Sequence, residues 1–205
     1  MTAIISFIHS ALAIAISGTT AWLTLFRRGQ VKMTTPTVIF LGPDGGPKDG
    51  TAPLSKIYLR TLLYSTAKRG HIVESMYVSL RRGESTQHFN IWVYGEDSLA
   101  RGSGLFIGED GVVCDHHFLL PADGTTFEFK PGDYILEIFA SLVGSETTTS
   151  LFQVPLTITS EQATKLLNND NGLYFDWGSD NRRYQAHVRL RPKRALPSWL
   201  SELAG

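Results

Sequence analysis

Four consecutive residues, Cys114, Asp115, His116 and His117, form the densest group of reactive side chains in the sequence. Thiolate, imidazole and carboxylate groups are the usual ligands of transition metals. A cysteine close to a histidine is also the basic unit of thiol catalysis. The group lies in residues 112–121, where apolar and polar residues alternate in the way that is typical of a β-strand.

Strand geometry limits what this group can do, because successive side chains point to opposite faces of a sheet. The first and third residues are expected to share one face, and the second and fourth the other. A metal site would need a further ligand from elsewhere, such as His88 or His71. We therefore expect a strand with Cys114 in the core and polar neighbours outside, and we predict no catalytic residue, metal or cofactor. A small metal- or thiol-dependent enzyme centred on Cys114 and His116 is the alternative.

A second candidate site is a set of basic residues in the last quarter of the chain. Its members are Arg182, Arg183, Arg189, Arg191, Lys193 and Arg194, to which Trp199 adds an aromatic side chain. Beside a membrane, such cations attract anionic lipid headgroups with about 1 kcal/mol each. A solvated hairpin face, balanced by Asp176 and Asp180, is the competing interpretation. The set is accordingly predicted to bind lipid or a partner, and a peripheral lipid-binding module is a further alternative for the whole chain.

The amino-terminal segment is predicted to anchor the chain in a membrane. Residues 1–26 contain no Asp, Glu, Lys or Arg, and residues 3–26 are long enough to cross the hydrocarbon core as a helix. Ser and Thr, the main polar residues of this run, can bond back to the preceding helical turn. Arg27, Arg28 and Lys32 follow the apolar run, and under the positive-inside rule they place the remainder of the chain in the cytoplasm. The single cysteine agrees with a reducing compartment.

The apolar run is also compatible with three other interpretations: a signal peptide, a segment that precedes the true start of translation, or a helix buried in a globular core. A secretory signal peptide normally begins with cations and ends at a cleavage site with small residues, whereas here the cations follow the apolar run. Translation from Met33 would leave the apolar segment out altogether. A helix buried in a globular core is disfavoured because the run is apolar on every face.

From residue 34 onward the pattern changes to alternating apolar and polar residues interrupted by Gly and Pro, which predicts an antiparallel β-domain. Pro155, inside one predicted strand, indicates an edge or a bulge. The chain is divided into an anchor (1–33), a sandwich (34–158) and a carboxyl-terminal helix, hairpin and amphipathic tail (159–205). Strands are predicted at 36–41, 56–64, 72–80, 88–94, 105–108, 112–121, 125–130, 134–143 and 150–158, and a helix capped by Thr159 or Ser160 at 160–167.

One stretch, residues 127–138, has a pattern of residues that is known from a structural family. Its residues are Phe127, Phe129, Pro131, Gly132, Tyr134, Leu136 and Ile138. It resembles the corner between strands E and F of immunoglobulin-like sandwiches, where a tyrosine folds its hydroxyl back to a nearby backbone group. The resemblance implies that role for Tyr134, and it places Trp92 where a strand C tryptophan would pack between the sheets. Leu136 stands where true immunoglobulin domains have their second cysteine, so the similarity is to the architecture and implies no activity.

Composition adds little about function. Nineteen basic and nineteen acidic residues balance, so there is no general attraction to nucleic acid, and nucleic-acid binding is not expected. The fold class predicted is mainly β: a transmembrane helix, an antiparallel immunoglobulin-like sandwich, and a small helix and hairpin. The function predicted is that of a single-pass, membrane-anchored module that binds another protein on the cytoplasmic side.

Overall fold

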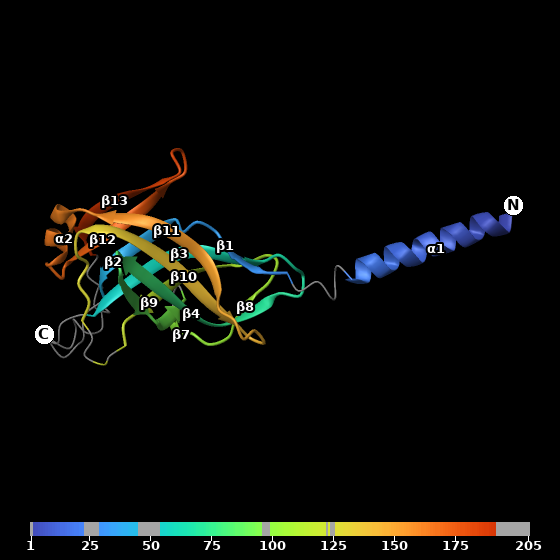
Figure 1. Cartoon of the computed structure of the whole chain (residues 1–205), viewed down its shortest axis with the longest axis horizontal. Helices are drawn as coiled ribbons and strands as arrows, with labels where there is room; N and C mark the ends of the chain where they lie inside the picture. Colours follow the sequence, from blue (N-terminus) through green and yellow to red (C-terminus); the bar gives the residue numbers. More distant parts are fainter. Residues whose placement is uncertain are drawn as a thin grey trace, which may run out of the picture.

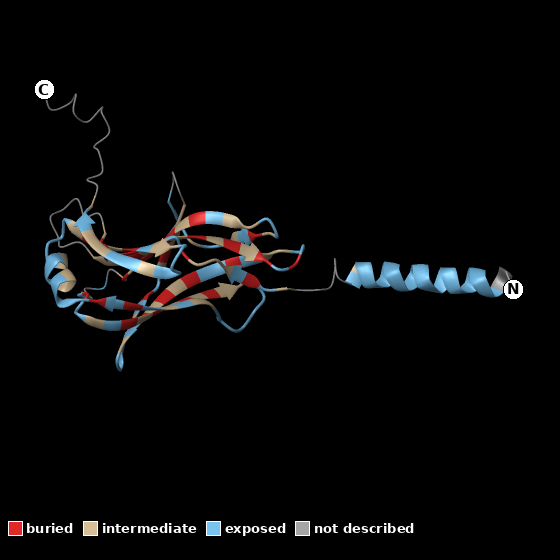
Figure 2. Ribbon diagram, turned by 90° about the horizontal axis from the view of Figure 1, so that it is seen from above, coloured by how far each residue is buried: buried red, intermediate tan, exposed pale blue. Residues whose placement is uncertain are grey.

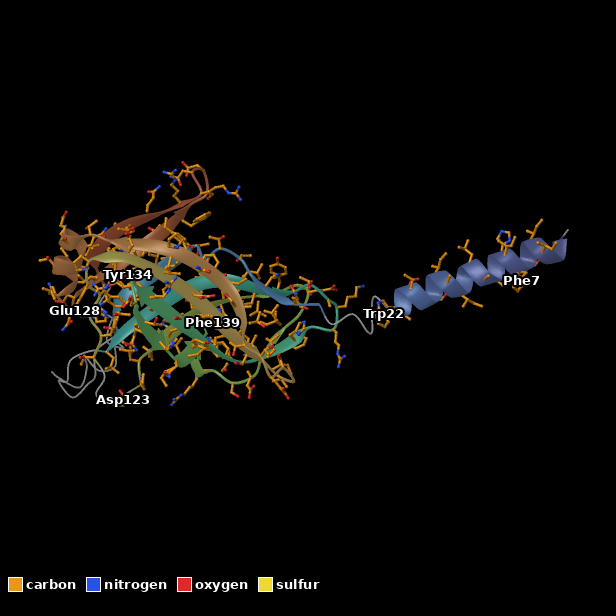
Figure 3. The ribbon with its side chains drawn as sticks, in the orientation of Figure 1. Phe7, Trp22, Asp123, Glu128, Tyr134 and Phe139 are labelled. Atoms are coloured by element: carbon orange, nitrogen blue, oxygen red, sulfur yellow. The ribbon has the colours of Figure 1, made fainter. Side chains whose placement is uncertain are left out.

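The computed structural model describes residues 2–22, 29–44, 54–95, 99–121, 123 and 126–191. Its first element is the helix α1 (Thr2–Ala21). The hydroxyls of Thr19 and Thr20 donate to the carbonyl oxygens of Ala15 and Ile16, each at 2.8 Å, as the composition of the segment predicted. Residues 4–21 have a mean hydropathy of 1.6 and none is buried against the described parts of the protein. The helix is coloured as exposed in Figure 2, and its side chains project into open space in Figure 3. The segment is therefore not a buried core helix.

The rest of the described chain is mainly β, in two antiparallel sheets that pack face to face (Figure 1). The strands are β1 (Val31–Met33), β2 (Val38–Pro43), β3 (Ser55–Ser65), β4 (His71–Arg82), β5 (Ser85–Phe89), β6 (Ile91–Tyr94), β7 (Ala100–Arg101), β8 (Leu105–Ile107), β9 (Val112–Leu119), β10 (Gly132–Leu142), β11 (Thr149–Ile158), β12 (Asn171–Gly178) and β13 (Arg183–Leu190); a short helix, α2 (Ser160–Leu166), lies between β11 and β12.

The eight-stranded sheet has the order β13-β12-β2-β3-β9-β6-β7, and β1 pairs with the end of β3. The five-stranded sheet has the order β11-β10-β4-β5, and β8 pairs with the beginning of β4. The two sheets differ in width on one side, because the β12–β13 hairpin extends beyond β2 while the five-stranded sheet ends at β11. On the inner face of the hairpin, Leu173 and Phe175 of β12 are buried in the core, whereas Tyr184 of β13 is only partly buried and Ala186 is exposed.

The core lies between the sheets and is built from every second residue of the long strands. In β3, Ile57, Leu59 and Leu63 are fully buried, and in β10 so are Leu136 and Ile138. Figure 2 shows this alternation as buried positions recurring along several of the long strands. Burying a side chain of this size stabilises the folded state by about 1.5–3 kcal/mol, so the core forms without a disulfide.

Most predicted strands are confirmed within one to three residues, but two predicted features are wrong. Residues 88–94 do not form one strand: the chain breaks at Asn90, β5 pairs with β4 in one sheet, and β6 joins β9 in the other. Residues 126–130 are not a strand, although Phe129 is part of the core and Phe127 packs against it. In both segments, apolar and polar residues alternate because every second side chain packs on the core. The backbone does not pair continuously with one neighbouring strand.

The sequence also predicts that the segments 105–108 and 112–121 pair as a hairpin around residues 109–111, and this prediction is wrong. The turn at Gly111 is present, but β8 pairs with β4 and β9 pairs with β3, so the turn carries the chain from one sheet to the other. The residue pattern of a short strand therefore does not determine which sheet it joins, and its partner is selected by the tertiary fold.

The carboxyl-terminal elements agree with the prediction. Thr159 caps α2: its side chain accepts from the backbone of Gln162, whose side chain accepts in return from the backbone of Thr159. β12 and β13 form the predicted hairpin, with Arg182 in the left-handed region at its turn (φ 54°). The amphipathic tail at 192–205 lies outside the described residues.

Candidate functional site

Strand β9 places Cys114 and His116 on its inward face, as its period-two pattern predicts. Both are buried, His116 with no exposed surface and Cys114 with 5%. The thiol sulphur of Cys114 lies 3.2 Å from Nε2 of His116. On the neighbouring strand β6, the indole Nε1–H of Trp92 donates to Nδ1 of His116 at 3.1 Å. Tryptophan, histidine and cysteine thus form one chain of contacts across β6 and β9.

The direction of these contacts fixes the protonation state of His116. An indole N–H can only donate, so Nδ1 of His116 must be the unprotonated nitrogen and Nε2 must carry the hydrogen that faces Cys114. Burial lowers the pKa of His116 from 6.5 to about 4, and the charge of Asp115 opposes this only in part. The imidazole is therefore neutral near pH 7.

This arrangement fits a structural role better than thiol catalysis. To activate Cys114, His116 would have to accept the thiol proton at Nε2, which already carries a hydrogen, and its lone pair on Nδ1 is occupied by Trp92. Both side chains are also shut away from solvent. Among the residues that the structure describes, no three His, Cys, Asp or Glu side chains lie close enough together to hold a metal ion.

Asp115 and His117 lie on the opposite, outer face of β9. Asp115 accepts from the guanidinium of Arg60 at 2.9 Å and from the hydroxyl of Tyr58 at 3.1 Å. The ring of His117 packs on Tyr58, with centroids 4.9 Å apart. Burial, with a smaller contribution from Asp115, raises the pKa of Tyr58 to about 12, and burial lowers the pKa of His117. These groups bind one another, as expected for polar neighbours outside the core.

The predicted basic set does not form one patch. Arg182 and Arg183 lie at the turn of the β12–β13 hairpin, whereas Arg189 and Arg191 lie at the other end of β13. Arg189 packs over the ring of Tyr174 at 4.2 Å. Arg191 donates to the carbonyl oxygens of Pro43 and Asn169, each at 2.8 Å. Lys193, Arg194 and Trp199 lie outside the described residues.

The unequal width of the sheets creates a groove of about 550 Å³. One wall is β11, the edge strand of the five-stranded sheet, and the other is the inner face of the β12–β13 hairpin, which extends past it. α2 contacts this hairpin at its far end. The groove is lined by Phe152, Val154, Leu156, Phe175, Trp177, Tyr184 and Ala186, together with Thr35, Gln153, Pro155, Thr157, Arg182 and Arg183.

The aromatic residues of the groove hold its shape. Trp177 and Tyr184 are paired across the hairpin, with ring centroids 5.0 Å apart in an edge-to-face arrangement. The hydroxyl of Tyr184 donates to the carbonyl oxygen of Pro36 at 2.7 Å, and burial strongly raises the pKa of this tyrosine. The hairpin is thereby fixed to the segment before β2, and the groove is rigid on that side.

The edge of β11 that faces this groove pairs with no other strand of the described chain. Pro155 determines which main-chain groups of β11 point outward from this edge. Proline has no N–H, so the pair Pro155–Ile135 cannot be one that exchanges two hydrogen bonds with β10. The antiparallel pattern then directs the N–H and C=O groups of Gln153 and Thr157, and the C=O of Pro155, away from β10. From the sequence, Pro155 indicated an edge or a bulge, and β11 is an edge strand.

A second hollow, of about 480 Å³, lies beside the corner at Tyr134. The hydroxyl of Tyr134 donates to the carbonyl oxygen of Lys130 at 2.7 Å (the residue is labelled in Figure 3), as the resemblance implied. Arg82 donates to the carbonyl oxygen of Pro131 at 3.1 Å and lies over the tyrosine ring. Gly132, with φ 139°, begins β10 at this corner. These residues shape the fold, and the hollow is lined mainly by polar side chains.

Comparison with known proteins gives no further guidance, since no family model, no curated protein and no solved structure matches the chain significantly. The function therefore has to be argued from the groove and from α1. Sequence patterns missed the groove because its lining residues alternate like ordinary core positions, and only the assembled sheets leave Phe152, Trp177 and Ala186 less than fully buried.

Proposed function

We propose that this protein is a single-pass, membrane-anchored module whose groove between β11 and the β12–β13 hairpin binds an extended segment of a partner protein. The observation that carries the proposal is the edge of β11, unpaired within the described chain, beneath an apolar, aromatic overhang. An added strand would pair with the edge through main-chain hydrogen bonds and would place alternate side chains under the hairpin.

The strand order supports an immunoglobulin-like architecture for the module. With β10 as strand F, β2-β3-β9-β6 corresponds to the A-B-E-D sheet and β11-β10-β4 to the G-F-C sheet. The hydrogen bond of Tyr134 at the corner before β10 is in keeping with this assignment. The same assignment puts Trp92 on strand D rather than on strand C, and makes β12 and β13 additions beyond strand A.

The groove also suggests what the bound segment contains. Apolar side chains at every second position would meet Phe152, Leu156 and Ala186 on the inner side. Arg182 and Arg183 line one end, so an acidic residue at that end of the segment would be favoured. Pro155 removes one donor from the ladder and weakens indiscriminate pairing of the edge, which leaves side-chain fit to select the partner.

Membrane attachment rests on α1, which is long and apolar enough to span a bilayer. Arg27, Arg28 and Lys32 follow it, and the positive-inside rule supports placing the sandwich in the cytoplasm. A module held at the membrane binds its partner at high effective concentration, so that a short groove of modest affinity suffices.

Site-specific photo-crosslinking in the native membrane tests the proposal. A photoreactive phenylalanine at Ala186 would point into the groove, whereas the same group at Gln185, the adjacent exposed residue, would point away from it. We expect a product with an extended, apolar–polar alternating segment of another protein from position 186 only, and its loss when Phe152 is replaced by Asp. Identical products from both positions, or products at 186 formed only with residues 192–205 of the same chain, would contradict the proposal.

A further inference from the structure

One end of the sandwich contacts Gly29 and Gln30, which follow Trp22 by seven and eight residues. The backbone N–H of Gln30 donates to the hydroxyl of Thr66 at 2.8 Å, and the N–H of Thr66 donates to the carbonyl of Gln30 at 2.9 Å. Gly29, with φ 62°, lies so close to Ala67 that a side chain would not fit. Gly29 and Gln30 are therefore fixed to the β3–β4 turn.

The same end carries a row of exposed apolar side chains on the outer face of the five-stranded sheet. Ile72 of β4 pairs with Phe106 of β8, and the N–H of Val143, just after β10, donates to the carbonyl of Ile72 at 2.9 Å. The exposed fractions are 42% for Ile72, 57% for Phe106 and 59% for Val143. The ring of Phe106 lies against Gly70 of the β3–β4 turn, which connects the row to the point where the anchor is joined.

Chain length holds this row near the membrane whatever the direction of α1. Gly29 follows Trp22 by seven residues, so at about 3.5 Å per residue the two are separated by no more than about 25 Å. Figure 1 shows β1 and β8 at the end of the sandwich that faces the helix. A row of exposed apolar side chains tethered so closely to a membrane-spanning helix lies within reach of the interface.

We propose that the row Ile72, Phe106 and Val143 inserts into the interface of the bilayer in which α1 is anchored, and so holds the sandwich in a fixed orientation on the membrane. The inference rests on the proposed membrane anchor and is independent of the groove. Apolar side chains that project from a tethered surface partition into the region between headgroups and acyl chains.

Charge does not carry this contact. Among the described residues of this end, the basic side chains are Lys32, Lys68 and Arg69 and the acidic ones are Glu74, Glu109, Asp110 and Glu146; Arg27 and Arg28 precede this end in the sequence. Because the two signs are roughly balanced, the contact is expected to depend on burial of the apolar row and only slightly on anionic lipid. This distinguishes it from a polybasic lipid-binding site of the type that the arginines of β13 suggested.

Depth-dependent quenching of a single label tests the inference on the full-length protein in phosphatidylcholine vesicles. Cys114 is 5% exposed, so an environment-sensitive thiol dye on folded protein will react with an introduced surface cysteine, and the unsubstituted chain provides the labelling control. F106C carries the label at the row, and L167C carries it at a 66% exposed leucine just after α2. We expect a blue shift and several-fold stronger quenching by nitroxide lipids at position 106 than at position 167, with little change when anionic lipid is added.

The outcomes separate this inference from the proposed anchor. If the protein resists alkaline extraction from the vesicles but both labels report water, the anchor stands and the inference is wrong. If the protein is extracted, the anchor itself fails. Quenching at 106 that appears only with anionic lipid would also overturn the inference, since charge and not the apolar row would then hold the domain. Replacing Ile72 and Val143 by Ser should remove the blue shift at position 106.

Discussion

At the scale of single residues, the most constrained side chain is His116. It is fully buried, accepts from Trp92 and faces Cys114. A buried polar group costs little only when it is hydrogen-bonded, and this imidazole meets that condition in its neutral form alone. Protonation would place a charge in the core and would also turn Nδ1 into a second donor facing the indole N–H.

His116 therefore predicts a loss of stability in acid. Its pKa is about 4 in the folded protein against 6.5 in the unfolded chain, so between these values unfolding takes up a proton. The contribution of His116 to the free energy of unfolding should be fully present above about pH 6.5 and should decrease as the pH is lowered to about 4. At 1.4 kcal/mol per pH unit, the contribution of this residue is about 3 kcal/mol. Urea unfolding of the full-length protein in detergent micelles, followed at several pH values, measures it.

H116Q provides the control for this prediction, because glutamine does not titrate and its amide oxygen can accept from Trp92. Other acid-sensitive groups affect both proteins, so the difference between their pH profiles isolates His116. The variant is expected to be less stable at pH 7 but to lose less stability on acidification. Parallel profiles would show that His116 does not titrate in this range.

Cys114, His116 and Trp92 show which parts of this site the sequence predicts and which it does not. Period-two geometry was sufficient to place Cys114 and His116 on one face and their neighbours on the other. The partnership with Trp92 could not be predicted, because Trp92 lies in a run whose pattern is that of one continuous strand. Only the break at Asn90, which moves β6 into the other sheet, brings the indole to His116.

At the scale of elements, the corner before β10 shows a loop held by one side chain. Residues 126–130 have no sheet pairing, and the hydrogen bond from Tyr134 to Lys130 connects this loop to β10. The corner was predictable because its Pro, Gly and Tyr are close together in sequence. Sheet partners were less predictable, since β8 is three residues long and its pattern suits either sheet.

Removing the hydroxyl of Tyr134 should destabilise the sandwich. Y134F leaves the ring in place but leaves the carbonyl of Lys130 without its donor, and the expected cost is about 1–2 kcal/mol. Y77F is the matched control: Tyr77 stacks on Phe139 on the outer face, with centroids 4.9 Å apart, and its hydroxyl makes no hydrogen bond within the described residues. Chemical denaturation should show a lower midpoint for Y134F and no change for Y77F. Equal effects of the two would assign the loss to the ring environment instead.

At the scale of the whole molecule, the groove depends on the complete fold, whereas α1, the proposed anchor, depends on one segment of the sequence. Whether β13 extends past β11 depends on how many strands each sheet recruits, which is a property of the complete fold. The anchor is the opposite case, since a run of apolar residues is visible in the sequence and forms a helix with no burial against the described sandwich. Local pattern therefore predicted α1 and most of the strands, while the groove required the assembled sheets.

The proposed role of α1 as a membrane anchor predicts that a charge in this helix abolishes membrane attachment without unfolding the sandwich. Leu12 lies near the middle of the span at 4–21 and is 57% exposed. An arginine there costs about 2.5–3.5 kcal/mol of insertion free energy, so L12R should shift a large part of the protein into the supernatant after alkaline extraction. L190R, at a 69% exposed leucine of β13, should remain in the membrane. The β-sheet circular dichroism of both variants should match that of the original protein. Retention of L12R in the membrane would mean that another part of the chain provides the attachment, and loss of its β-sheet signal would mean that the sandwich depends on the helix.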